Sequence, residues 1–198
     1  MTKFLTIKHW QLFGLLIGLP MALQFIIMAF VSSSNDPTTM FYFFPIMMIL
    51  FIGLFFGWFY ALGTNLHKKL PSTVTMNLKR FKIFLLIPVV YMLLISVFMV
   101  GMFSNISSGG HTNPAIFILI VSLHLFSMFC IFYCLYFNAK ALKTVEWQKP
   151  VTFSDFAGEF FLIWFFPIGI WIIQPRINKL FDTNIDNDNN QILDNNIQ

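Results

Sequence analysis

The sequence predicts an all-α protein, a polytopic membrane helical bundle with four transmembrane helices and a re-entrant or interfacial fifth apolar segment. Three observations support this fold class. The chain of 198 residues is 58% hydrophobic and only 10% charged, whereas soluble domains are about one quarter charged. Four apolar runs have the length of a membrane span. The basic residues are also confined to segments that four crossings would place on one side.

The predicted spans contain no Asp, Glu, Lys or Arg, and each is long enough to cross about 30 Å of hydrocarbon as a helix. Helices are expected because no water satisfies backbone N–H and C=O groups at that depth. In chain order the spans are 12–31, 40–62, 83–103 and 115–137, which correspond to Leu12–Val31, Met40–Leu62, Ile83–Phe103 and Ala115–Phe137.

All 12 Lys and Arg residues lie before the first span, between the second and third, or after the fourth. The connections 32–39 and 104–114 contain none. The positive-inside rule therefore predicts that the N- and C-termini are cytoplasmic. The abundance of Asn, Ile, Lys and Phe suggests a bacterial source, and so the cytoplasmic (inner) membrane. Anionic headgroups of the lipid bilayer, and not nucleic acid, are the predicted partners of these cations.

The fifth apolar run, Phe160–Ile173 (160–173), has only fourteen residues and is interrupted by Pro167 and Gly169. Runs of this length are more often re-entrant or interfacial than spanning. We expect the chain to enter the membrane, turn at residues 167–169 and return to the same surface. Such a return brings Glu159 and Arg176 close enough to form an ion pair. A short, tilted fifth transmembrane helix is the alternative.

Asp155 and Glu159 are four residues apart, so they would share one face of a helix that begins near Thr152. Together with Arg176 they form the candidate site at the cytoplasmic interface. One interpretation is a paired-carboxylate site in a membrane enzyme that acts on lipid headgroups. The favoured interpretation is that acidic residues stabilise the first turns of a helix through its dipole, because no His or Cys lies nearby in the sequence.

Gln24 and His124 are the most notable polar residues within the spans. Counted from the outer ends of their spans, which adjoin the connections 32–39 and 104–114, the two residues lie at similar depth. A hydrogen bond between them is therefore expected. Such a bond would be an interhelical clamp of modest strength. The functional alternative is a mid-membrane site that lines the path of a small transporter or channel, because ionisable groups in the membrane are commonly functional.

Small residues recur every fourth position on the first two spans, which is typical of closely packed membrane helices. In an antiparallel hairpin each residue of one stripe would face its counterpart on the other at a single register. Self-association of two chains through either stripe is the alternative. The two stripes are Gly14, Gly18 and Ala22 on the first span, and Gly53, Gly57 and Ala61 on the second.

We expect one integral membrane domain over residues 1–181, followed by a disordered Asn/Asp-rich tail over 182–198. No catalytic motif, metal site or cofactor is identified in the sequence. The predicted function is therefore a non-catalytic subunit or accessory factor of a membrane complex. Its expected partner is a second copy of the chain, as a homo-oligomer, or another membrane protein.

Overall fold

The computed structural model describes residues 3–33, 39–109 and 114–181. Every regular element in these ranges is a helix, which confirms the predicted all-α class. The predicted tail, 182–198, lies outside the described residues. In chain order the elements are α1 (Lys3–Thr6), α2 (His9–Phe13), the π-helix η1 (Gly14–Gly18), α3 (Leu19–Ser33), α4 (Thr39–Lys68), α5 (Leu78–Ser107), α6 (Pro114–Trp147), α7 (Phe153–Trp164) and α8 (Phe166–Phe181).

Four helical stretches among the described residues are long and apolar enough to cross a membrane, which makes this a membrane protein. They are His9–Ser33, Phe43–Lys68, Leu78–Ile106 and Ala115–Trp147, and they correspond to the four predicted spans. The fifth apolar run does not form another helix of this kind. It is divided between α7 and α8, which have 12 and 16 residues.

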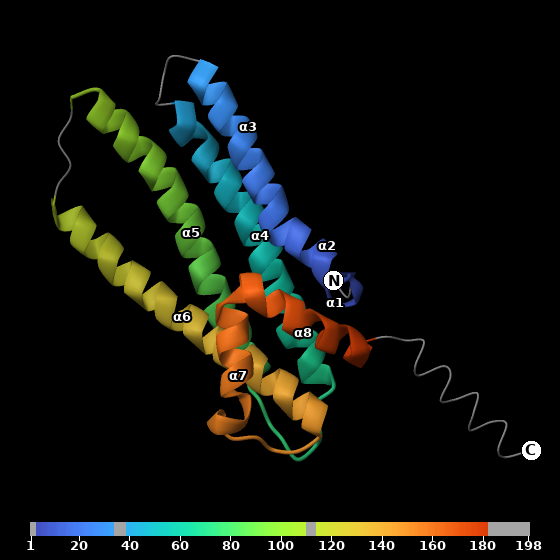
Figure 1. Cartoon of the computed structure of the whole chain (residues 1–198). Helices are drawn as coiled ribbons and strands as arrows, with labels where there is room; N and C mark the ends of the chain where they lie inside the picture. The colour runs from blue at the N-terminus through green and yellow to red at the C-terminus, as the bar shows by residue number, and fades with distance from the viewer. Residues whose placement is uncertain (1–2, 34–38, 110–113, 182–198) are drawn as a thin grey trace, which may run out of the picture.

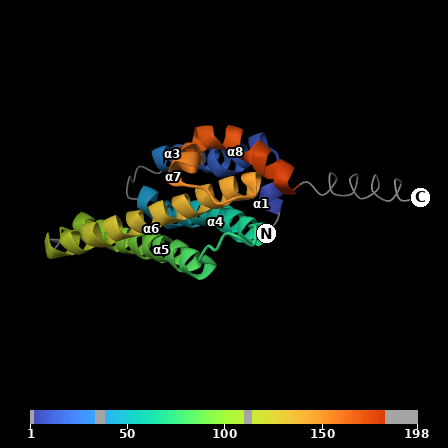
Figure 2. The same cartoon turned by 90° about the horizontal axis from the view of Figure 1, so that it is seen from below.

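The long helices converge at one end of the molecule and separate toward the other (Figure 1). The end of α4, the start of α5 and the end of α6 lie together at the convergent end, beside α1, α7 and α8. Because these segments and the connections next to them carry every Lys and Arg in the chain, we call this the basic end. Figure 2 shows α4 and α6 between α5 on one side and α3, α7 and α8 on the other.

The core lies at the basic end, where α4, α5 and α6 cross at close range. The rings of Phe81 and Phe137 stack there with their centroids 4.4 Å apart. Gly63 on α4 leaves room for the Phe81 ring of α5, because a Cβ at position 63 would lie 2.4 Å from that ring. Buried side chains continue along α6 well past Phe137, the predicted end of the fourth span. Leu142, for example, is fully inaccessible to solvent. Burial keeps this extension helical as far as Trp147.

The first spanning stretch contains a widened turn. Residues Gly14–Gly18 form a π-helix, and the N–H of Leu19 donates to the carbonyl of Gly14. Pro20 follows directly, and a proline inside a helix lacks an N–H and collides with the carbonyl four residues earlier. The π-turn relieves the crowding around the Pro20 ring. A proline of this kind is a recognised cause of local distortion in helices.

The chain turns between α7 and α8, which pack against each other. The turn lies at Phe165, which has φ −86° and ψ 54°, slightly earlier than the predicted 167–169. Pro167 instead occupies the first turn of α8, where its missing N–H costs no helical hydrogen bond. A Cβ on Gly169 would lie 1.7 Å from the carbonyl oxygen of Leu162. Glycine is therefore required for the close approach of the two helices.

The predicted glycine-to-glycine register between the first two spans does not form. The stretch η1–α3 does pack against α4. However, a Cβ added to Gly14, Gly18 or Gly53 would meet no heavy atom within 4 Å. Ala22 is exposed, whereas Ala61 is fully buried in the core. A Cβ added to Gly57 would lie 3.8 Å from the ring of Phe4 in α1. Gly53 and Gly57 also line a surface groove between α4 and α5, so the glycines of the second span lie beside α5 and α1 instead of the first span.

Candidate functional site

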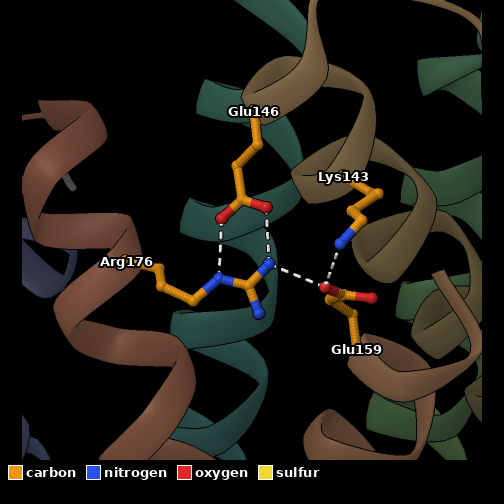
Figure 3. A network of polar contacts seen from close by, with 4 residues as sticks. All are labelled: Lys143, Glu146, Glu159 and Arg176. Carbon is orange, nitrogen blue, oxygen red and sulfur yellow. Dashed lines mark hydrogen bonds and ion pairs between the residues drawn. The ribbon is translucent and has the colours of Figure 1, made fainter. Parts of the chain in front are cut away.

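Four charged side chains form an ion network at the basic end, shown in Figure 3. The Arg176 guanidinium donates to both carboxylate oxygens of Glu146, with Nε–Oε1 2.7 Å and Nη2–Oε2 2.5 Å. The same Nη2 donates to Glu159 Oε1 at 2.6 Å. Lys143 Nζ donates to that oxygen at 3.0 Å. Two cations and two carboxylates thus form an electrically neutral group.

The network joins three successive helices, α6, α7 and α8. Lys143 and Glu146 are three residues apart on α6, so they lie on one helical face. Glu159 comes from α7 and Arg176 from α8. The predicted contact between Glu159 and Arg176 is therefore present in the structure. Glu146 was not among the candidate residues, although its spacing from Lys143 on the continuation of the fourth span was a usable signal.

Burial and hydrogen bonding act in opposite directions on these groups. Burial raises the pKa of the Glu159 carboxyl, but hydrogen bonds from Arg176 and Lys143 outweigh it, so the pKa lies below its ordinary value. Hydrogen bonding to Glu146 raises the pKa of Arg176, against the effect of burial. The Glu159 side chain is only 6% exposed. Glu159 and Arg176 therefore remain charged at neutral pH, and the network acts as a clamp between helices.

The alternative of a paired-carboxylate site does not fit the structure, because Asp155 and Glu159 have different partners. Asp155 Oδ2 accepts from the backbone N–H of Thr152 at 2.7 Å and from its hydroxyl at 2.8 Å. These bonds lower the pKa of Asp155. Asp155 thus caps the start of α7. Within the described ranges, no group of three or more His, Cys, Asp or Glu side chains could hold a metal ion.

Gln174 forms a second polar connection on a different face of α8, which no pattern in the sequence indicated. Its Nε2 donates to the carbonyls of Phe4 at 3.0 Å and Ile7 at 3.2 Å. Its Oε1 accepts from Trp58 Nε1 of α4 at 3.3 Å. One turn later, Asn178 Nδ2 donates to the carbonyl of Ile7 at 3.1 Å. These bonds satisfy carbonyls at the end of α1 and attach the N-terminal segment to α8.

The structure does not bring Gln24 and His124 together. Gln24 lines an apolar pocket of about 260 Å³ between α3, α4 and α5, whose other walls include Phe43 and Met99. His124 lies elsewhere, exposed on α6, where its Nδ1 is 3.3 Å from the hydroxyl of Tyr91 on α5. The predicted hydrogen bond between Gln24 and His124 is therefore wrong.

Most cations at the basic end form no ion pair with a carboxylate of the described residues. In that part of the chain the carboxylates are Glu146, Asp155 and Glu159, and all three are engaged as described above. Of the 12 Lys and Arg residues, only Lys143 and Arg176 form ion pairs with them. The other ten are Lys3, Lys8, Lys68, Lys69, Lys79, Arg80, Lys82, Lys140, Lys149 and Lys179.

Comparison of the chain with protein-family models, with curated proteins and with solved structures finds no match in any of the three.

Proposed function

We propose that this protein is a non-catalytic subunit or accessory factor of a membrane complex in the bacterial cytoplasmic membrane. In this proposal the basic end faces the cytoplasm, both termini are cytoplasmic, and the diverging ends of α5 and α6 bind a second copy or another membrane protein. The neutral ion network is consistent with a structural role, because each of its carboxylates is already bound to a cation.

The exposure of His124 is the observation that carries this proposal. It lies within an apolar stretch long enough to cross a membrane, yet its side chain is exposed in the single chain. Ionisable groups in spanning helices almost always face a protein interior or an aqueous cavity. The contact with Tyr91 satisfies only one ring nitrogen. A protein surface that covers this face would supply a partner for the other.

The surroundings of His124 agree with this proposal. On the first half of α6, large apolar side chains are exposed around the whole helix, among them Ile118 at 71% and Leu125 at 65%. The facing part of α5 is similar, with Val97 at 69%. The outer halves of α5 and α6 thus form an arm whose apolar side chains are largely exposed, whereas the basic end is tightly packed. A rigid base with a free apolar arm suits lateral association between membrane helices.

Photocrosslinking in intact membranes tests this proposal. A photoreactive residue at Val121, close to His124 on α6, is expected to give a discrete protein adduct, either a dimer of the 23.1 kDa chain or a conjugate with another membrane protein. The same residue at Phe25, which is 70% exposed on α3, is the matched control and is expected to give lipid adducts only.

Substitution of His124 supplies the specificity test. Because His124 is exposed in the single chain, His124→Leu is expected to preserve the fold and the amount of protein in the membrane. It is also expected to abolish the adduct formed from Val121. Lipid adducts alone at Val121, or a protein adduct that persists unchanged in His124→Leu, would refute the proposed interface.

A further inference from the structure

We propose that the groove between α4 and α5 at the basic end binds one anionic phospholipid, with its phosphate at Lys82 and an acyl chain along the apolar part of the groove. The groove lies on the surface of the molecule and has a volume of about 380 Å³. This site is separate from the α5–α6 arm and does not depend on the function proposed above.

The groove is polar at one end and apolar along its length. Lys82 and Tyr60 lie at the basic end, and the Lys82 ammonium is 5.7 Å from the centre of the Tyr60 ring. The remaining walls are apolar and come from both helices. From Lys82 to Val89, seven residues along α5 rise about 10 Å. That length fits within the roughly 15 Å of hydrocarbon in one leaflet.

The open floor of the groove is formed at Gly53. A Cβ on Gly53 would meet no heavy atom within 4 Å, although Ile52 and Phe56 beside it are buried. The chain therefore leaves unfilled space next to a packed wall, at the depth of the acyl chains. An acyl chain can fill a shallow space of this shape without the polar contacts that another ligand would require.

Charge complementarity selects an anionic phospholipid over the other occupants. Lys82 is exposed and forms no ion pair with any carboxylate of the described residues. Lys79 and Arg80, in the same turn of α5, also lack such a partner. A transmembrane helix of a second copy would cover Lys82 without neutralising it, whereas a soluble phosphate would leave the apolar part of the groove empty. A phospholipid neutralises Lys82 with its phosphate and fills the apolar part of the groove with its acyl chain.

Native mass spectrometry of the full-length detergent-solubilised protein tests this site. Phosphatidylglycerol and phosphatidylcholine with identical acyl chains are added at equal concentration, and the lipid-bound fraction is measured. Preferential retention of one phosphatidylglycerol is expected. Lys82→Gln is expected to weaken that retention about fivefold, the factor contributed by one cation at an anionic surface. Lys149→Gln, remote from the groove and also without an ion pair to the described carboxylates, is the charge control and is expected to bind as the wild type does.

Filling the groove tests the apolar half of the site. Gly53→Leu is expected to reduce retention of phosphatidylglycerol, whereas Gly101→Leu, at another helical glycine with no heavy atom within 4 Å of its Cβ position, is expected to leave it unchanged. Soluble glycerol phosphate is expected not to compete. The proposal would be overturned by equal binding of the two lipids or by full retention of phosphatidylglycerol in Lys82→Gln. It would also be overturned by matching effects of the two leucine variants, by competition from glycerol phosphate, or by a lipid-free dimer that covers the groove.

Discussion

Replacement of Arg176 by Gln measures how strongly the ion network holds α6, α7 and α8 together. The substitution removes three hydrogen bonds to carboxylates, two to Glu146 and one to Glu159. A hydrogen bond to a charged group contributes about 1.5–3 kcal/mol when it is buried. The Arg176 side chain is 30% exposed, and Lys143 still neutralises Glu159 in the variant. We therefore expect a total loss of about 2–4 kcal/mol, which is less than the sum of three buried bonds.

Thermal unfolding in detergent, followed by tryptophan fluorescence, measures this loss. For a chain of this size, 1 kcal/mol corresponds to about 2–4 °C in Tm, so a decrease of roughly 5–15 °C is expected. Lys179→Gln removes an exposed cation from the same helix and is the matched control. The double variant with Glu146→Gln is expected to be less destabilised than the two single losses added together, because the residues interact directly. A Tm for Arg176→Gln indistinguishable from that of Lys179→Gln would refute this account of the network.

Three further outcomes follow from contacts at the same end of the molecule. The folded-state pKa of Glu159 lies below its ordinary value of 4.5. Its contribution to the free energy of unfolding is therefore complete above about pH 4.5 and decreases as the pH falls through the lower, folded-state pKa. In a pH series of melting curves, Glu159→Gln is expected to remove this acid-dependent loss. Gly169→Ala places a methyl group against the Leu162 carbonyl and is expected to lower Tm by several degrees, since overpacking costs about 1–3 kcal/mol. The control is Gly158→Ala, which has open space around it and is expected to leave Tm unchanged or slightly raised. Gln174→Leu removes two bonds to carbonyls at the end of α1, so hydrogen exchange of residues 3–8 is expected to accelerate while α4 remains protected; unchanged exchange there would show that α1 is held by apolar packing alone.

The architecture could be predicted from the sequence because it depends on local properties of the chain. Uncharged runs of adequate length mark helices that can cross a membrane, and the positions of Lys and Arg identify one end of the bundle. The short fifth run and its proline predict a segment that returns to the same end. The contact between Glu159 and Arg176 follows from that return, since it requires only that both residues lie near the same surface.

Side-chain partners were harder to predict, because they depend on the rotation and separation of helices distant in the sequence. The Gly14 and Gly53 stripes satisfy a simple register, but Gly53 lines the groove between α4 and α5 instead of meeting the first span. Gln24 and His124 match in depth, but they face different neighbours. Gln174 was missed because its partners on α1 and α4 are distant in the sequence and include backbone carbonyls, which no sequence pattern reveals.

The attachment of α1 to α8 also determines when the molecule can be completed during synthesis. Gln174 and the Phe4 carbonyl are 170 positions apart, so the ribosome needs roughly 10–30 s to make the second partner after the first, at 5–20 residues per second. Throughout that interval the beginning of the chain can pack against α4 but lacks its hydrogen-bonding partner on α8. A product truncated before residue 174 would keep its four long apolar helices but lose the hydrogen bonds that attach its first residues to α8.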